Sequence, residues 1–300
     1  METKPSFISR LTKPHLFERI LKKIGSYFFI NQWIILIAPN TGYKSLAWLD
    51  FKPLIPPLDR FWADPFIWVH EDISYLFIEE LLYATQRGRI ACLTLNEEMN
   101  IRSNQVVLER PYHLSYPFLF NHEGQLFMIP ETRENNGVEL YRCTHFPDQW
   151  EFEKTLISNV HAVDATLVKA QDKWWLFTNM EEDGSTWDTL HLYYADHPLS
   201  DQWTPHPLNP IVKDIHSARP AGRIFLENGS LIRPSQDCSV RYGYALNFNR
   251  IVSLTETDYT EICEQSFKPP QKGDILAVHT FNNAAGLTAI DAKQRRRKFQ

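Results

Sequence analysis

Five polar residues recur along the chain, each within or at the start of an apolar run. They are Asp64, Tyr116, Asp164, Arg219 and His279, and the offsets between them are 52, 48, 55 and 60 residues. The clearest run is Phe-Trp-Ala-Asp-Pro-Phe-Ile-Trp over residues 61–68. A carboxylate inside such a run costs free energy unless it is paired, so it calls for a structural partner or a functional reason.

A second apolar run follows each of these positions after a short polar turn, and in two units it ends in acidic residues. Glu79 and Glu80 end one such run, and Glu131 ends the next. Two carboxyl groups, one as general acid and one as general base or nucleophile, are what glycosidic bond cleavage requires. Asp64 as base and Glu131 as acid are therefore a candidate catalytic pair, although an exposed loop glutamate is the alternative for Glu131.

The repeat predicts an all-β fold. Units of about fifty residues with three or four short strands each are typical of propeller blades, which bury their sheet faces by packing around an axis. Five units fit between residues 31 and 292, which predicts a five-bladed β-propeller. The last unit, 275–292, is too short for a blade, and the strand expected over 33–38 would complete it and join both ends of the chain.

In a propeller the innermost strands line a central channel, so the five recurring residues are expected to converge there as a ligand site. The structural alternative is that Asp64 and Asp164 accept hydrogen bonds from the backbone and brace the blades. The fourth unit is basic, which suits a phosphate or a sugar acid; pairing of these arginines with Asp64 and Asp164 is the other interpretation. The basic residues of the fourth unit are Arg219, Arg223, Arg233, Arg241 and His216.

Other chemistry has little support in the sequence. Several tryptophans could stack on sugar rings, although most are expected to pack the blades; they are Trp62, Trp68, Trp174, Trp175 and Trp187. No nucleotide-binding, serine hydrolase or HExxH motif is present, and His113, His122, His145 and His161 are scattered. We expect neither a cofactor nor a metal.

The two ends of the chain carry basic segments. Residues 13–29 have apolar residues at helical spacing between lysines and arginines, which predicts an amphipathic helix in an arm over residues 1–30. This helix is expected to dock on its own domain or a partner, and contact with a membrane surface is the alternative. Residues 293–300 are expected to be a solvated, disordered basic tail, with contact to anionic lipid or another acidic surface as the alternative.

Composition excludes some classes of protein. The net charge of −5 does not suggest a broad nucleic-acid-binding surface, and no apolar stretch is long enough for a membrane span. The first nine residues lack the pattern of a signal peptide, and the four cysteines are widely spaced without a CxxC pair. We therefore expect reduced, buried thiols, with zinc binding or a disulfide framework as the alternative. We also expect a cytoplasmic protein, with a membrane-peripheral location as the alternative.

Five segments resemble one known family, the N-terminal domain of plant glucosamine inositolphosphorylceramide transferases, which also occurs in bacterial proteins. Phe-Trp-Ala-Asp-Pro-Phe, Arg-Pro-Ala-Gly and Arg-Pro-Ser-Gln-Asp are the most specific motifs. The segments are 60–68, 114–131, 163–177, 217–236 and 279–291. The family in turn resembles the five-bladed propellers of glycoside hydrolase family 43. That resemblance implies that Asp64 is a general base and that Asp164 tunes the acid and stabilises the transition state.

One position departs from the hydrolases, which have a general-acid glutamate where this chain has Arg219. A guanidinium does not act as a general acid near neutral pH, so Glu131 or Glu80 takes the role or hydrolysis has been lost. The function expected is binding of a sugar or sugar phosphate at the channel mouth, with glycosyl hydrolysis or transfer if it is catalytic. The site would comprise Asp64, Glu131 and Asp164 as catalytic residues, and Glu80, Tyr116, Arg219, Arg233 and His279 as binding residues. The alternative is a non-catalytic glycan-recognition or accessory module in glycolipid or polysaccharide synthesis.

Overall fold

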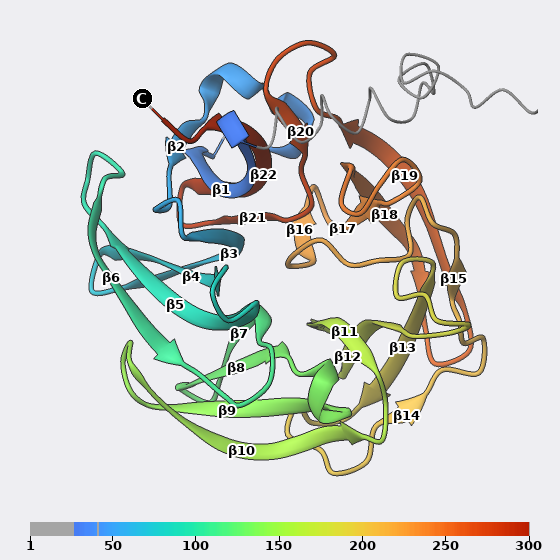
Figure 1. Cartoon of the computed structure of the whole chain (residues 1–300). Coiled ribbons are helices and arrows are strands. Elements are labelled where there is room, and N and C mark those ends of the chain that lie inside the picture. The colour runs from blue at the N-terminus through green and yellow to red at the C-terminus, as the bar shows by residue number, and fades with distance from the viewer. Residues whose placement is uncertain (1–26, 41, 300) are drawn as a thin grey trace, which may run out of the picture.

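The structure is a computed structural model that describes residues 27–40 and 42–299. Five sheets surround a common axis, as the five-unit repeat predicted (Figure 1). Residues 1–26, with nearly all of the helix expected over 13–29, lie outside the described residues. Among those described, no helix is long and apolar enough to cross a membrane.

The first three blades are antiparallel sheets built from consecutive strands. Blade 1 contains β3 (Arg60–His70), β4 (Ile73–Leu82), β5 (Arg87–Leu95) and β6 (Ile101–Leu108). Blade 2 contains β7 (Ser115–His122), β8 (Gln125–Glu131), β9 (Gly137–His145) and β10 (Gln149–Ser158). Blade 3 contains β11 (Ala162–Ala170), β12 (Lys173–Met180), β13 (Thr189–Ala195), β14 (Thr204–Pro205) and β15 (Val212–Lys213).

Blade 4 has a less regular inner edge. Its strands are β16 (Phe225–Glu227), β17 (Ser230–Asp237), β18 (Ala245–Leu254) and β19 (Tyr259–Phe267). The segment Arg-Pro-Ala-Gly before β16 forms only an isolated bridge, from Pro220 to Ser235. Three short 3₁₀ helices lie outside this blade, namely η2 (Tyr43–Ser45), η3 (Trp48–Asp50) and η4 (Arg133–Asn135).

Blade 5 joins the two ends of the chain, as predicted. It contains β1 (Phe29–Pro39), β2 (Lys52–Leu54), β20 (Ile275–Ala277), β21 (Phe281–Ala284) and β22 (Leu287–Arg297). β1 pairs with β22 along its whole length, from Phe29 opposite Arg297 to Pro39 opposite Leu287. A long antiparallel pair between chain ends fastens the ring, because opening it would break the hydrogen bonds of the entire ladder.

The C-terminal segment differs from its prediction. Residues 293–297, expected to belong to a disordered basic tail, instead continue β22 as far as Arg297. The reason is the partner strand: β1 begins at Phe29 rather than 33 and offers backbone groups to pair with these residues. Charge alone predicted a solvated tail, and pairing at long sequence separation overrode it.

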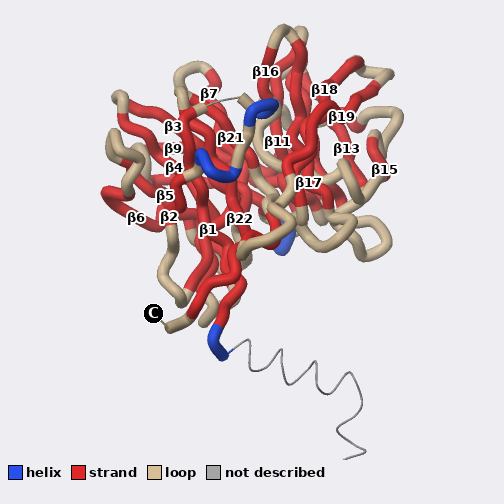
Figure 2. Tube along the Cα trace, turned by 90° about the horizontal axis from the view of Figure 1, so that it is seen from above, coloured by secondary structure: helices blue, strands red, loops and turns tan. Residues whose placement is uncertain are grey.

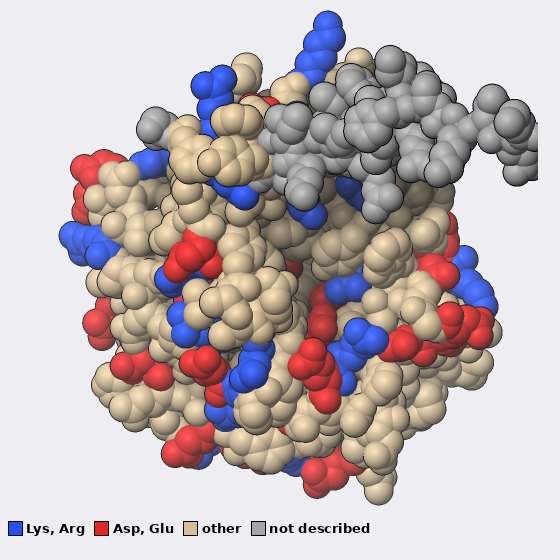
Figure 3. All heavy atoms as spheres, viewed as in Figure 1, with Lys and Arg blue, Asp and Glu red and all other residues tan. Residues whose placement is uncertain are grey.

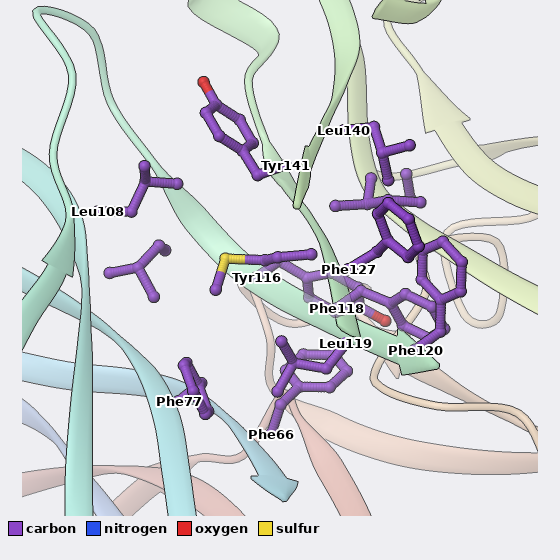
Figure 4. Packing of buried hydrophobic residues seen from close by; sticks show 14 of the residues in the cluster. Phe66, Phe77, Leu108, Tyr116, Phe118, Leu119, Phe120, Phe127, Leu140 and Tyr141 are labelled. Carbon is purple, nitrogen blue, oxygen red and sulfur yellow. The ribbon is translucent and has the colours of Figure 1, made fainter. Parts of the chain in front are cut away.

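The core lies between the blades. The largest cluster runs from blade 1 through blade 2 to blade 3 and is rich in aromatic rings, including Phe66, Phe77, Tyr116 and Phe118 (Figure 4). The ring of Phe66 meets those of Tyr116 and Phe118 edge to face, at centroid distances of 4.9 and 5.8 Å. Such contacts between successive inner strands fix the spacing of the blades around the axis.

All four cysteines are free thiols. Cys92, Cys143 and Cys238 are buried as expected, whereas Cys263 is exposed on β19. Burial raises the pKa of the Cys143 thiol to about 11, so this group is inert near neutral pH.

Gly222 allows blades 4 and 5 to approach closely, and Gly222→Ala is expected to destabilise the fold by roughly 3 kcal/mol or more. A Cβ there would lie 2.0 Å from the Phe281 carbonyl oxygen, and its φ is +125°. Gly229→Ala is the control: φ is +79° and nothing lies within 4 Å, so only backbone strain of roughly 1 kcal/mol is expected. Chemical denaturation measures the free energy of unfolding of both variants. Equal losses of stability would mean that the close approach of the blades at Gly222 is not what excludes a side chain there.

Candidate functional site

Three of the five recurring residues share an unusual backbone. Asp64, Tyr116 and Asp164 have φ values of 50°, 46° and 55°, in the left-handed region. Each lies in a register shift, between Ala63 and Phe66 in blade 1 and at the matching points of blades 2 and 3. A bulge of this kind redirects a side chain. The fifty-residue alignment is therefore confirmed for these three, whereas neither Arg219 nor His279 has a positive φ.

The Asp64 carboxylate bridges three blades. Oδ2 accepts the Tyr116 backbone N–H at 3.1 Å from blade 2, and Oδ1 accepts the Thr280 hydroxyl at 2.7 Å from blade 5. The Nδ1 atom of His279 lies 3.6 Å from Oδ1. Asp64 thus braces the start of the blades, as the structural interpretation of the sequence proposed, while remaining 8% exposed at its side chain.

A second carboxylate, Asp291, holds the histidine. β20 and β21 both pair with β22, and the break between them carries His279 and Thr280. Asp291 accepts both of their backbone N–H groups, at 2.9 and 3.0 Å, and its Oδ2 lies 2.6 Å from His279 Nδ1. Burial opposes protonation of His279, but the Asp291 charge outweighs it and raises the histidine pKa. The sequence does not single out Asp291, because its unit, 275–292, is too short for a whole blade.

Arg219 joins two carboxylates across the axis. Its Nε donates to Asp164 Oδ2 at 2.6 Å, and its NH2 atom lies 3.7 Å from Glu131 Oε2. Gln236 also donates to Asp164 Oδ2, at 3.3 Å. The pairing of an arginine with Asp164, one of the two interpretations of the sequence, is therefore the one observed. In the space-filling view, acidic and basic side chains lie beside one another near the hollow middle of this face (Figure 3).

Burial shifts the two acids that were expected to be catalytic. It raises the pKa of Glu131 to about 8, with help from the Asp164 charge and against the Arg219 charge. Burial likewise raises the pKa of Asp64 to about 7, opposed by His279 and reinforced by Glu79 and Asp291. A carboxyl group that keeps its proton near neutral pH can act as a general acid. Glu131, 13% exposed at its side chain, has that property.

Glu79, not Glu80, is the counterpart of Glu131. In the register of the sheets Ala63 lies opposite Glu79 and Ser115 lies opposite Glu131. Because side chains alternate along a strand, Glu80 faces the other way. Arg60, Arg89, Trp62 and Asn104 donate to its carboxylate. The expectation that Glu80 lines the site is wrong for this reason. Burial would raise the pKa of Glu80, but these donors outweigh it and lower the pKa.

Two further predicted binding residues have structural partners. Arg233 is fully buried, and its guanidinium donates to Glu261 and to the Ser217 carbonyl oxygen, away from Asp64 and Asp164. Tyr116 is also fully buried; its hydroxyl meets Thr166 Oγ1 at 2.8 Å and accepts the Gly222 N–H at 2.7 Å. Tyr116 therefore joins blades 2, 3 and 4 below the mouth, and Arg233 does not contribute to the site.

An aromatic rim, formed by Trp187 and Tyr242, lies beside the charged cluster. The Arg219 guanidinium lies over the Tyr242 ring at 4.9 Å, and Tyr242 lies 6.0 Å from Trp187, which is 37% exposed. The Trp33 ring packs 4.0 Å from His279. Of the tryptophans considered for stacking, Trp187 is the one at the mouth, whereas Trp62 and Trp175 are in the core. Tyr242 and Trp33 carried no repeat signal that would have revealed them.

One more histidine reaches the cluster from the loop before β7. His113 Nε2 lies 3.2 Å from Glu79 Oε1, and the Gly88 N–H donates to its Nδ1 at 3.0 Å. The hydrogen bond from Gly88 leaves the imidazole proton on Nε2, from which it is donated to Glu79. No pattern in the sequence separates His113 from the other scattered histidines.

Within residues 27–40 and 42–299, two groups of side chains have the composition of metal ligands. Asp64, His279 and Asp291 form one, but their ligand atoms already bind each other, Thr280 and backbone N–H groups. His122, Glu123 and His197 form the other, at the opposite end of the blades. The Leu199 N–H donates to His197 Nδ1, so His197 holds its proton on Nε2 and donates it to His122 at 2.8 Å. Hydrogen bonds therefore account for the first group and for the facing histidine nitrogens of the second, whereas Glu123 is an exposed carboxylate.

Comparison with known proteins identifies the family. The model of the family described as glucosamine inositolphosphorylceramide transferase 1, N-terminal, matches residues 57–284. The chain belongs to this family. It is 36% identical over 212 residues to glucosamine inositolphosphorylceramide transferase 1 of Oryza sativa subsp. japonica and 35% identical to that of Arabidopsis thaliana. Each match covers 68% of this chain but only 28% and 27% of the two relatives, so the chain spans about a quarter of their length.

The fold of this family member is shared with glycoside hydrolases. An α-L-arabinofuranosidase from Lactobacillus brevis superposes with a TM-score of 0.56 at 17% identity, covering 77% of this chain and 82% of that one. A family 117 glycoside hydrolase from the marine bacterium Zobellia galactanivorans gives a TM-score of 0.55 at 10% identity, covering 88% and 91%. At such low identity these similarities establish the fold alone.

Proposed function

We propose that the channel mouth binds a sugar and that Glu131 is the general acid of glycosyl hydrolysis or transfer there. The observation that carries this proposal is the placement of Glu131 beside Asp164 and Arg219, where burial holds its proton near neutral pH. Asp164 would set the pKa of Glu131, and Asp64 would serve as the base. Glu131 would thus take the role of the general-acid glutamate that the hydrolases have at the position of Arg219.

The charge of the cluster bears on the type of sugar. Arg219 is already paired with Asp164 and Glu131, so a phosphate or sugar acid could use it only by displacing Glu131. With Glu131 protonated, Arg219 and His279 each already have a carboxylate partner in Asp164 and Asp291, so among the described residues the cluster offers no unpaired cation to an anion and suits sugar hydroxyl groups or an amino group better. The relatives are named for glucosamine, an amino sugar, and for inositolphosphorylceramide, a lipid that contains a phosphate. We therefore propose that the ligand is a neutral or amino sugar. The sequence predicted a sugar phosphate, which is the ligand to compare with it.

A second function is glycan recognition without turnover. The observation in its favour is that both oxygens of Asp64 already accept hydrogen bonds that hold blades 2 and 5, which leaves the base occupied. Screening aryl glycosides, amino sugars, nucleotide sugars and sugar phosphates for both binding and release distinguishes the two. Release of the aglycone supports the enzyme, and saturable binding without release supports recognition.

Binding of either kind is expected to depend on the aromatic rim. Trp187→Ala should weaken sugar binding about tenfold or more, because an exposed indole beside the mouth provides a stacking face. Titration calorimetry with the best ligand of the screen measures the change. Phe152→Ala is the matched control, since Phe152 is 52% exposed on the outer strand β10. Equal affinities of the two variants would rule out a sugar site at this rim.

A further inference from the structure

The β1–β22 ribbon projects beyond the rest of the propeller. The second strand of each blade ends near the mouth, at Leu82 in β4, Glu131 in β8 and Met180 in β12. β22 has already reached the mouth at Asp291, which holds His279, and it continues for six more residues to Arg297. At about 3.3 Å per residue this carries the ribbon about 20 Å past the site. The side view shows the paired ends of β1 and β22 standing clear of the blades (Figure 2).

The tip of this ribbon is aromatic and exposed. Tyr27 and Phe28 precede β1 and are 65% and 51% exposed, and Phe299 follows β22 and is 61% exposed. The Tyr27 ring lies 5.2 Å from Phe28 and 5.7 Å from Phe299, so the three form one cluster. Exposed aromatic clusters are uncommon on a soluble surface and mark contact with a partner or a membrane.

The flank of the ribbon is basic. Arg296 faces inward opposite Ile30, where its guanidinium binds Gln32 and the Pro56 carbonyl oxygen. Arg295 and Arg297 are exposed on the other face, and within the described part of the chain neither has an acidic partner. The Arg295 guanidinium lies 4.2 Å from the Phe29 ring centre. Lys298 adds a further exposed charge beside Phe299.

A groove follows this basic flank. It has a volume of about 560 Å³, and its lining includes Arg295, Arg296 and Arg297 against one carboxylate, Asp274. Ile55, which is 45% exposed, adds an apolar wall. Cations beside apolar and aromatic groups match the two layers of an anionic bilayer surface, in which phosphates lie above acyl chains.

We propose that the tip and basic flank of the β1–β22 ribbon dock on an anionic lipid surface. The aromatic rings of Tyr27, Phe28 and Phe299 enter the interfacial layer, and Arg295, Arg297 and Lys298 meet lipid phosphates. Because the ribbon rises from the mouth side of blade 5, docking turns the candidate site toward the lipid surface. This proposal does not depend on the sugar site. It rests on described residues, of which Tyr27 and Phe28 belong to the end of the helix expected over 13–29 and the others to the C-terminal segment.

The test is sedimentation of the full chain with vesicles of phosphatidylcholine alone and with about 30% phosphatidylserine added. Binding to the anionic vesicles should exceed binding to the neutral ones and should weaken as salt rises. Arg295→Gln/Arg297→Gln is expected to weaken binding about 25-fold, since each cation near an anionic surface contributes about fivefold. Tyr27→Ser/Phe28→Ser/Phe299→Ser should weaken binding at low and high salt alike, because it removes the apolar contact.

Matched variants elsewhere serve as controls. Arg102→Gln/Lys213→Gln removes two exposed charges from blades 1 and 3, and Leu226→Ser/Val252→Ser removes exposed apolar groups from blade 4. Both controls should bind vesicles as the unmodified chain does, and circular dichroism should show all variants folded. Equal sedimentation of the ribbon variants and the controls would overturn the proposal. Absence of binding to the anionic vesicles would also overturn it. Self-association of the chain through the ribbon, detected by light scattering, would do the same.

Discussion

Glu131→Gln is expected to lower glycosyl turnover by about 100- to 10,000-fold while leaving sugar affinity within a few fold. The amide has nearly the same shape as the carboxyl group but cannot deliver the proton to the leaving oxygen. Glu131 is the acid of the cluster that is both near the mouth and held protonated by burial and by Asp164. Steady-state rates with an aryl glycoside or donor sugar identified by screening, together with calorimetry, measure the two effects separately.

The pH dependence of turnover gives an independent check. In the proposed mechanism, turnover requires Asp64 ionised and Glu131 protonated, and the pKa values of these groups are raised to about 7 and about 8. The rate should therefore fall below about pH 7 as Asp64 gains a proton, and above about pH 8 as Glu131 loses one. In Glu131→Gln the fall on the alkaline side should disappear from the residual rate.

Glu123→Gln is the matched control, since Glu123 lies in the turn after β7 at the opposite end of the same blade and is 81% exposed. Its turnover should be unchanged. If Glu131→Gln and Glu123→Gln keep the same rate, Glu131 is not the acid. If the unmodified chain binds a sugar but never releases product, the recognition function replaces the catalytic one.

Arg219→Met is expected to lower the free energy of unfolding by about 3–5 kcal/mol. The guanidinium is buried, with Asp164 2.6 Å away and Glu131 3.7 Å away, so its removal leaves Asp164 without its ionic partner inside the ring. Asp164→Asn combined with Arg219→Met should recover part of the loss, because the uncompensated charge is then absent. Urea denaturation of the two variants and of the unmodified chain measures these differences.

A surface arginine with the same number of partners provides the comparison. Arg142 pairs with Glu151 and Glu153 at 3.2 and 3.0 Å, but it is 38% exposed. Arg142→Met should cost less than about 1 kcal/mol, because water already screens both ion pairs. A loss for Arg219→Met no larger than that for Arg142→Met would mean that the central cluster does not hold the blades together.

Much of the fold could be predicted because the repeat is local. Each blade places an apolar inner strand, a turn and a second apolar strand close together in sequence, so β3 with β4 and β7 with β8 were evident from the pattern alone. Closure of the ring through the N-terminal strand could also be predicted. The last unit, 275–292, has too few strands for a blade, and the strand expected over 33–38 belongs to no other unit. The shared left-handed φ of Asp64, Tyr116 and Asp164 shows that the repeat also encodes a backbone bulge.

The sequence was less informative about the direction in which a side chain points and about pairing between strands far apart in the chain. Glu79 and Glu80 are neighbours in the chain, and only the register of β4 against β3 shows that Glu79 faces the mouth while Glu80 faces Arg60 and Arg89. Residues 293–297 resemble a solvated tail because charge is a local property, whereas their partner residues lie 260 to 268 positions earlier.

By itself, the sequence determined the five-unit repeat, its closure and the set of charged residues at the inner strands, since these depend on the order of residue types along the chain. The tertiary structure decided which charges meet. Arg219 pairs with Asp164 and Glu131, Asp291 holds His279, and Trp187 and Tyr242 form the rim. These contacts join side chains from different blades, and their distances depend on how the ring closes, which no local pattern encodes.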